Sequence, residues 1–418
     1  MSSLPTIAQV NCVVVGTTGS AGSDPTPPRA PRSDAPGVLY SLQYVRAFAA
    51  LSVALYHFKP TFVGYGGPVG LAGLVDAGYA GVDAFFVLSG FLMVWTSRLE
   101  EAPAPFILRR LARLYIGYLP IALALLLYKY FTLGIQHQVH QPIEVWSSLL
   151  LLNPDAYTAI IFPAWSLYYE LLFYIAFAGI LIAGRWGFIF AVLLALTAYA
   201  VVGWSGVLGP TQSAALLNPI NAEFIIGMAL GNIALQGRLS RSQAVLAAPL
   251  AICLIAFGCI SGQTAWRIVW FGVGFFFLYY VLIYLELNGR MWKLALGKHL
   301  GDSSYAIYLL HIPVIYVMQT TGSFDRILSV GGWPLLLAIF VATLLVVPSA
   351  FHLLVETPLN RGARRLIGQA LGQRRASTAP DRPRSEAVQA MVPQAACDGV
   401  VTIGKRASTD AQTVLDTA

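Results

Sequence analysis

Two ionisable residues inside one apolar stretch are the feature of this sequence that could do chemistry. Arg46 and His57 both lie in the apolar stretch Ser41–Val63, which is long enough to cross a bilayer. An ionisable side chain there is costly and usually functional. The two residues are about three helical turns apart, so their side chains emerge on nearly the same face, roughly 16 Å apart along the axis. This pattern indicates a path or a reaction centre inside the membrane.

The depths of the other charged residues suggest a general base at His57. At ~1.5 Å per residue, His57 and Asp83 each lie about 24 Å from the cytoplasmic side, and Glu170 lies about 22 Å from it. His311 lies near the midplane of its own segment. A carboxylate at the depth of His57 can orient the imidazole and stabilise its protonated form. We therefore expect Asp83 or Glu170 to contact His57.

A second cluster has the composition of a phosphate site. Arg109, Arg110 and Arg113 stand together just before an apolar segment, and three guanidinium groups at a helix entrance can clamp phosphate. Coenzyme A carries a 3′-phosphate and a pyrophosphate that would suit such a clamp. The chain has no glycine-rich phosphate loop, and Val87–Phe91 lacks the first glycine of a GxSxG nucleophile elbow.

Each of these residues also has a purely structural explanation. The histidines could make only helix-to-helix hydrogen bonds, and Asp83 could be a helix cap. Glu170 could belong to an interfacial aromatic belt beside Trp165. The arginine cluster could be no more than the positive charge usual on the cytoplasmic side of a membrane protein.

The composition indicates an integral membrane protein. The 418 residues are 57% hydrophobic and 11% charged, with a mean hydropathy of +0.68, whereas soluble domains carry about a quarter charged residues. Much of the net charge of +7 lies in the last sixty residues, which argues against nucleic-acid binding. The four cysteines form no CxxC pair and no zinc-type cluster, so we expect no disulfide framework and no metal.

The elements that must position these residues are all α-helical. Lys and Arg gather after the second, fourth, sixth and eighth of ten apolar segments, so those loops and both termini are expected in the cytoplasm. We expect a disordered tail over 1–38, a ten-span membrane domain over 39–358 and a basic, disordered tail over 359–418. The ten predicted spans are Ser41–Val63, Gly78–Thr96, Leu111–Phe131, Trp165–Leu181, Trp186–Val202, Ala214–Leu235, Ala244–Ile260, Trp266–Leu285, Gly301–Gln319 and Trp333–Leu354.

Six motifs in one order carry a family resemblance over about Leu42 to Pro358. They are Arg46 with His57, the run Gly81–Phe91, Arg109 and Arg110 with Arg113, the run Trp165–Glu170, the run Gly301–Tyr305 followed by Tyr308 and His311, and Glu356–Pro358. In these motifs the sequence resembles the membrane acyltransferase-3 family, known for bacterial O-acetylation of surface polysaccharides. The opening block and the short loops look most like the subset that acetylates exopolysaccharides.

The resemblance implies a set of site residues. It implies that Arg46 and His57 are essential and that Arg109, Arg110 and Arg113 handle a cytoplasmic acetyl-CoA donor, the acceptor sugar lying outside. Because Arg46 is nearer the cytoplasm, we expect it to position the donor. Further candidates within the matched motifs are Asp302, Tyr305, His311 and Glu356.

The sequence departs from the family pattern at two points. Gly117 stands near where a proline often follows the arginines, and no soluble SGNH-type hydrolase domain is attached. The short tail cannot carry a second catalytic step, so acyl transfer should occur in the membrane domain or on a separate protein.

We therefore predict a multi-pass membrane O-acyltransferase of the bacterial inner membrane. It would move an acetyl or other short acyl group from acyl-CoA to a hydroxyl of an exopolysaccharide or other surface saccharide. His57 would act as general base or as transient acyl carrier. The expected partners are a saccharide acceptor, with or without a lipid link, membrane lipids and polysaccharide-assembly proteins. The rival function is a transporter or flippase of a lipid-linked saccharide, which would need no CoA.

Overall fold

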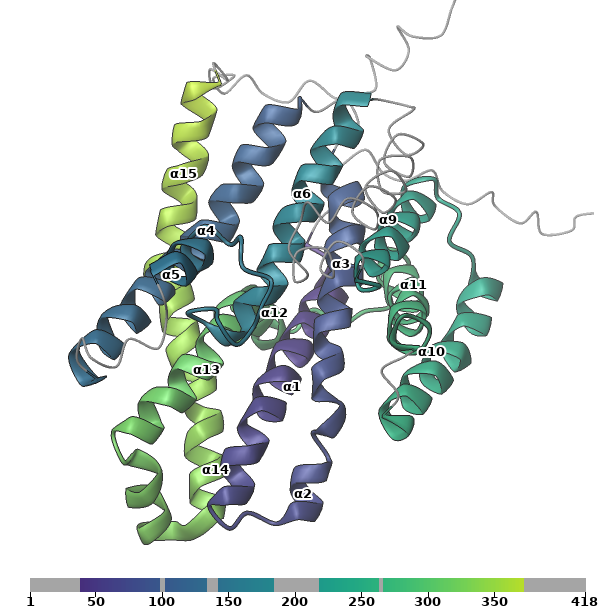
Figure 1. Cartoon of the computed structure of the whole chain (residues 1–418). Helices are drawn as coiled ribbons and strands as arrows, with labels where there is room; N and C mark the ends of the chain where they lie inside the picture. The colour runs from purple at the N-terminus through teal and green to yellow at the C-terminus, as the bar shows by residue number, and fades with distance from the viewer. Residues whose placement is uncertain (1–37, 98–101, 134–141, 184–217, 263–265, 372–418) are drawn as a thin grey trace, which may run out of the picture. The chain divides into compact units, whose positions relative to one another are not determined.

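The described part of the chain is helical and contains no strand. The computed structural model describes residues 38–97, 102–133, 142–183, 218–262 and 266–371 (Figure 1). Its helices are α1 Tyr40–Gly64, α2 Val69–Gly73, α3 Gly81–Thr96, α4 Pro103–Leu133, α5 Pro142–Leu149, α6 Trp165–Ala183, α9 Asn221–Leu235, α10 Arg241–Ser261, α11 Gly274–Leu287, α12 Ala295–Asp302, α13 Ser304–Thr320, α14 Ser323–Phe351 and α15 Thr357–Ala370. Four short 3₁₀ or π turns join them: η1 Asp76–Ala80, η3 Phe162–Ala164, η5 Ile268–Val273 and η6 His352–Glu356. The predicted all-α fold is confirmed for these residues.

Nine of the ten predicted spans overlap these helices, and Trp186–Val202 lies outside the described residues. The number of ten spans and the placement of the termini stay predictions. Among the described residues, six helical stretches are long and apolar enough to cross a membrane: Val69–Thr96, Pro103–Thr132, Phe162–Ile182, Arg241–Ser261, Ile268–Leu287 and Ser323–Ala370.

The predicted start of a disordered tail at residue 359 is wrong for its first residues. Helix α15 runs from Thr357 to Ala370 and packs against α4. Its exposed side chains include Arg361, Arg364 and Arg365. The remainder of that tail and the predicted tail over 1–37 lie outside the described residues.

Helix α1, which carries Arg46 and His57, is held at its start by a distant carboxylate. It has no side-chain cap of its own, and the first backbone N–H groups of a helix need an acceptor. The carboxylate of Glu286 at the end of α11 accepts the backbone N–H of Tyr40 (2.5 Å) and that of Ser41 (2.8 Å). This contact fixes where the helix begins.

Helices α3 and α9 approach closely enough for their backbones to touch. A Cβ atom added to Gly90 would lie 2.0 Å from the Phe224 carbonyl oxygen, and one added to Gly227 would lie 1.9 Å from that of Val87. Glycines at such a crossing let membrane helices pack without intervening side chains. The contact with α9 holds the C-terminal half of α3 in place.

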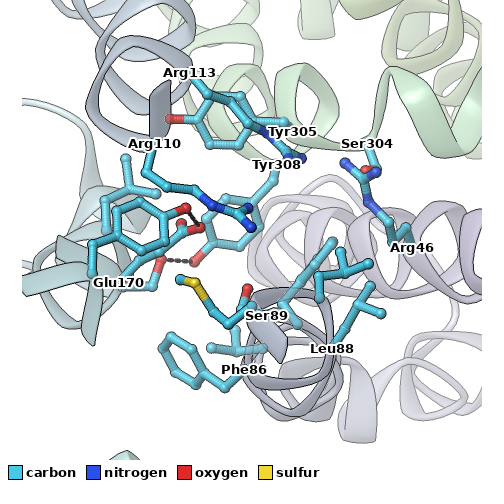
Figure 2. A pocket seen from close by; sticks show the side chains of 17 residues that line it. Arg46, Phe86, Leu88, Ser89, Arg110, Arg113, Glu170, Ser304, Tyr305 and Tyr308 are labelled. Atoms are coloured by element: carbon cyan, nitrogen blue, oxygen red, sulfur yellow. Dashed lines mark hydrogen bonds between the residues drawn. The ribbon is translucent and has the colours of Figure 1, made fainter. Parts of the chain in front are cut away.

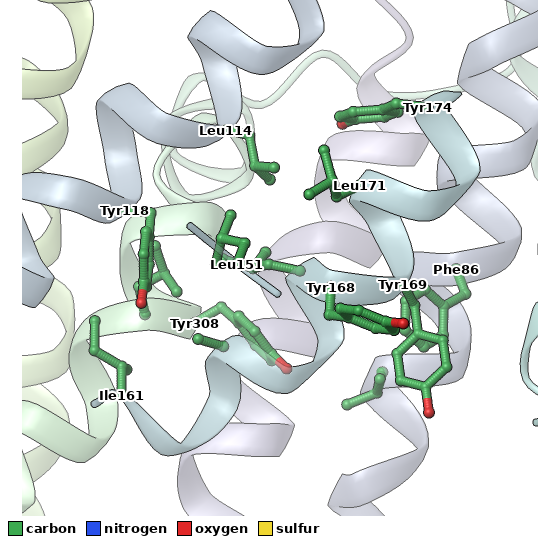
Figure 3. Close-up of a cluster of buried hydrophobic side chains, with 14 of the residues drawn as sticks. Phe86, Leu114, Tyr118, Leu151, Ile161, Tyr168, Tyr169, Leu171, Tyr174 and Tyr308 are labelled. Carbon is green, nitrogen blue, oxygen red and sulfur yellow. The ribbon is translucent and has the colours of Figure 1, made fainter. Parts of the chain in front are cut away.

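The segment between α4 and α6 folds into the core. The hydroxyl of Tyr118 donates to the Ser148 carbonyl (2.9 Å) and that of Tyr115 to the Leu150 carbonyl (2.8 Å). Leu151 is buried in the same hydrophobic cluster, beside Tyr118 and Ile161 (Figure 3). Residues 150–152 thus follow α5 as a turn packed on α4, and the chain continues from there to η3 and the start of α6.

Candidate active site

His57 meets a second histidine. The Nε2 atom of His311 in α13 lies 3.1 Å from Nδ1 of His57. The same His57 nitrogen lies 2.9 Å from the Val53 carbonyl oxygen, and Nδ1 of His311 lies 2.5 Å from the carbonyl oxygen of Tyr308. His311 is fully buried and His57 is half-buried. Two residues that the sequence placed in different spans therefore form one hydrogen-bonded pair.

The expectation that Asp83 contacts His57 is wrong. Asp83 is fully buried, and both of its oxygens accept from the guanidinium of Arg267, at 2.6 and 2.7 Å. Gly81 packs on the backbone of α1 at Ala49, and two positions further along a helix the side chain points to the other side. Asp83 consequently faces η5. Glu223 of α9 is buried beside this ion pair.

Glu170 also lies away from His57, because the turn before α6, and not the middle of that helix, packs against the His57 ring. Phe162, in the turn before α6, packs edge-on against the His57 ring, with centroids 5.4 Å apart. Glu170 is about two helical turns beyond Phe162, roughly 12 Å further along the helix. Its carboxylate accepts a hydrogen bond from the hydroxyl of Tyr174.

Glu170 instead lines a cavity together with three arginines (Figure 2). Arg46 comes from α1, Arg110 and Arg113 from α4, and Glu170 from α6. The cavity volume is about 80 Å³. Its lining is completed by Val82, Phe85, Phe86, Leu88, Ser89, Leu92 and Met93 of α3, Ser166, Leu167 and Tyr174 of α6, and Ser304, Tyr305 and Tyr308 of α13. Three cationic side chains against one carboxylate suit an anionic ligand.

The arginines are held at the cavity by different contacts. Arg110 donates to the Thr96 hydroxyl (2.8 Å) and lies over the rings of Phe106 and Tyr174, 5.5 and 5.9 Å from their centroids. Arg46 donates to the side-chain oxygen of Gln43 (3.2 Å). Arg113 is exposed. None of these contacts is an ion pair, which leaves the guanidinium charges available to a ligand.

The predicted clamp of Arg109, Arg110 and Arg113 is only partly assembled. Arg110 and Arg113 are one turn apart on α4 and share the cavity, whereas Arg109 is not among the residues that line it. Adjacent residues on a helix point about 100° apart, so one of the neighbouring pair must face elsewhere. The third arginine that lines the cavity is Arg46 of α1.

Two further candidate carboxylates lie near the cavity with partners of their own. Asp302 accepts from Lys298 (2.6 Å), and Glu356 pairs with His352 (2.9 Å). Both act electrostatically on Arg46. Neither of them lines the cavity.

Tyr305 explains the glycine at position 117. The Tyr305 hydroxyl donates to the Leu114 carbonyl (2.8 Å), and its ring lies where a Cβ on Gly117 would stand, at 2.2 Å. A larger residue at 117 would displace the ring from the cavity wall. The sequence could not show this contact, because the two positions are 188 residues apart along the chain.

Ser166 and Tyr308 form the inner wall of the cavity, a pair to which sequence reasoning gave no role. Their hydroxyls are 2.8 Å apart, and that of Tyr308 also donates to the Pro163 carbonyl (3.1 Å). The Tyr308 ring lies 5.9 Å, centroid to centroid, from the His311 ring. Tyr308 thus contacts both the arginine cavity and the histidine pair.

Comparison with known proteins identifies the family. Residues 39–352 match the model of an acyltransferase domain. The chain is 31% identical over 326 residues, 72% of its length, to the exopolysaccharide production protein ExoZ of Rhizobium meliloti (strain 1021), of which the match covers 95%. No solved structure matches. With its apolar helices and this match over most of its length, the chain belongs to the membrane acyltransferase-3 family and is a multi-pass membrane acyltransferase.

Proposed function

We propose that this protein transfers an acetyl or other short acyl group from cytoplasmic acyl-CoA to a hydroxyl of an exopolysaccharide or other surface saccharide. The observation that carries the proposal is the cavity in which Arg46, Arg110 and Arg113 converge from two helices, separated from the His57–His311 pair by Tyr308. The relative from Rhizobium meliloti, named for exopolysaccharide production, supports the choice of acceptor.

In the proposed donor site the arginines bind phosphate. Charge-assisted contacts between guanidinium and phosphate are strong and directional. The cavity volume of about 80 Å³ is several times the ~10–15 Å³ that one water molecule needs, so an acyl group of a few atoms fits. Apolar side chains such as Leu88 and Phe86 form the wall opposite the arginines (Figure 2). A short acyl chain is the substrate that such a wall suits.

In the proposed reaction centre His57 removes the proton of the acceptor hydroxyl. As the sugar oxygen attacks the thioester carbonyl carbon, the O–H proton moves to an imidazole nitrogen. The new C–O bond forms, the C–S bond breaks, and the CoA sulfur leaves with the proton returned by His57. In the carrier version the imidazole nitrogen itself first takes the acyl group and then yields it to the sugar.

Acetyl transfer by the purified protein tests the function. In proteoliposomes with radiolabelled acetyl-CoA and an exopolysaccharide acceptor, wild-type protein should label the saccharide. The His57→Ala variant should be slower by about 10²–10⁴-fold, the usual contribution of a general base. His299→Ala is the matched control, because His299 of α12 belongs neither to the cavity lining nor to the histidine pair.

Two outcomes would contradict the proposal. Near-normal labelling by a well-inserted His57→Ala protein would remove His57 from the reaction. Movement of a lipid-linked saccharide across the bilayer with no acetyl transfer would favour the transporter function instead. Label that stays on wild-type protein when acceptor is left out, and is missing from the variant, would select the carrier version.

A further inference from the structure

The hydrogen bonds of the histidine pair determine which ring nitrogens carry protons. Each ring has one nitrogen beside a backbone carbonyl oxygen, and the two rings share a third contact. A carbonyl oxygen can only accept a hydrogen bond, while a neutral imidazole has one donor and one acceptor nitrogen. These two facts leave a single consistent arrangement.

The arrangement starts at His311. Its Nδ1 atom lies 2.5 Å from the Tyr308 carbonyl oxygen, so Nδ1 carries the proton. His311 is fully buried and has no carboxylate among its hydrogen-bond partners in the described residues. A charged imidazolium would be costly there, so the ring is neutral and its Nε2 atom is a bare acceptor.

The state of His57 follows from its neighbours. Its Nδ1 atom faces two acceptors, the Val53 carbonyl oxygen at 2.9 Å and Nε2 of His311 at 3.1 Å. Nδ1 must therefore be the protonated nitrogen, shared between both acceptors. The opposite tautomer would set an unprotonated Nδ1 against the carbonyl lone pairs of Val53. Nε2 of His57 is left as the unprotonated nitrogen.

We propose that His311 is the positioning residue of this enzyme, holding His57 as the Nδ1–H tautomer with Nε2 free to receive the acceptor hydroxyl proton. Nε2 of His57 has no hydrogen-bond partner among the described residues, and the ring is half-buried. Its other neighbours are the aromatic edges of Tyr56 and Phe162, with centroids at 5.2 and 5.4 Å. The catalytic role of His311 rests on the proposed acyl transfer. The tautomer of His57 follows from the hydrogen bonds alone.

His311 takes the place that the sequence analysis gave to a carboxylate. When Nε2 accepts the proton of the sugar hydroxyl, the Nδ1–H bond to His311 stays in place and steadies the ring. A neutral acceptor does this without a buried negative charge, which would be costly in the apolar interior. The two carboxylates that were expected at His57 have other partners, Arg267 for Asp83 and Tyr174 for Glu170.

Nitrogen NMR of the intact protein tests the tautomer directly. With ¹⁵N-labelled histidine, the His57 signals can be assigned among the six histidines by their loss in His57→Gln. We expect a protonated Nδ1 and an unprotonated Nε2. A protonated Nε2 with a bare Nδ1 would overturn the proposal, whether or not the protein proves to be an acyltransferase.

Two variants of His311 test its role in transfer. In His311→Gln the amide oxygen reaches the place of the imidazole Nε2 and keeps an acceptor for His57. In His311→Asn the shorter amide can still donate to the Tyr308 carbonyl but offers His57 no acceptor. Transfer should stay within about tenfold of wild type for Gln and fall about 10²-fold for Asn, part of what a general base contributes.

The supporting readouts separate this role from a merely structural one. Acyl-CoA affinity should be unchanged in both variants, because neither touches the arginine cavity. In the Asn variant the Nδ1–H of His57 keeps only the Val53 carbonyl oxygen as acceptor, so the His57 Nδ1 signal should shift while the tautomer is retained. Equal transfer rates for Gln and Asn, with an unchanged His57 spectrum, would overturn the positioning role. If wild-type protein transfers no acyl group while the expected tautomer is seen, the proposed function fails and the pairing stands.

Discussion

At the scale of single residues, the partner of each buried charge determines what that charge can do. Asp83 is fully buried, and each of its oxygens accepts a hydrogen bond from Arg267, so its charge is neutralised inside the protein. Arg110 and Arg113 share the cavity lining instead. Substitution in the Asp83–Arg267 pair should therefore change the stability of the protein, whereas substitution of a cavity arginine should change the binding of a ligand.

The cavity arginines should control donor affinity. Arg110→Ala and Arg113→Ala should each weaken acyl-CoA binding by about 10- to 150-fold, because a hydrogen bond to a charged group contributes about 1.5–3 kcal/mol. Titration calorimetry on purified protein measures this affinity. Arg109→Ala is the control from the same helix, and it should change the affinity little because Arg109 is not part of the lining. Equal weakening in all three variants would indicate general surface charge.

The Asp83–Arg267 pair should matter for stability. Arg267→Ala should lower the free energy of unfolding by about 3–5 kcal/mol, because it leaves the fully buried Asp83 carboxylate unpaired. Asp83→Ala should cost less, because the Arg267 side chain that it leaves is 27% exposed. The double variant should lose less than either single one. Unfolding in mixed detergent, followed by circular dichroism, measures the three values. Additive losses in the double variant would show that the two side chains do not stabilise each other.

At the scale of helices, close backbone contact positions the residues that the site needs. Glu286 of α11 caps the start of α1, and the glycines of α3 and α9 let those helices touch. Between membrane helices there is little hydrophobic driving force, so close packing and interhelical hydrogen bonds supply most of the free energy of helix association. A single methyl group added at the α3–α9 contact should therefore lower the free energy of unfolding.

Two glycine substitutions should change the free energy of unfolding in opposite directions. Gly227→Ala should lower the free energy of unfolding by about 1–3 kcal/mol, because the new Cβ would overlap the Val87 carbonyl oxygen of α3. Gly179→Ala in α6 adds the same atom where nothing lies within 4 Å. It should stabilise by about 0.5–1 kcal/mol through helix propensity. A neutral Gly227→Ala would mean that the helices are further apart than described.

At the scale of the whole chain, the side of the membrane on which each loop lies follows from charge. The stretch between α4 and α6 has no Lys or Arg, whereas the turn between α9 and α10 carries Arg238 and leads into Arg241. Positively charged loops stay in the cytoplasm. The first stretch is therefore predicted outside and the second inside.

Cysteine labelling in intact cells tests this orientation. In a background with the four native cysteines replaced, Tyr157→Cys should react with an impermeant thiol reagent, because Tyr157 is 85% exposed in the stretch predicted outside. Gln236→Cys, exposed in the turn before α10, should react only after lysis. The reverse pattern would invert the topology and with it the side from which the donor enters.

The sequence by itself determined the class, the family and most helices. Hydropathy and helical period can be read directly from the sequence, so Arg46 and His57 could be assigned to one helix without coordinates. Glu170 and His311 were also named, but their partners were not predictable. The depth of each residue along its helix does not show which neighbouring helix its side chain faces.

Only the tertiary structure decided which side chains meet. His57 and His311 are separated by 254 positions, and Asp83 and Arg267 by 184. Depth along a helix is readable from residue counts, but the direction in which a side chain points depends on which helix packs beside it. The segment before α6 folds inward by contacts with Tyr115 and Tyr118. Glu170 consequently lines the arginine cavity, whereas its depth in the sequence had suggested a contact with His57. No local pattern records such a contact, because its energy arises between residues that are distant in the chain.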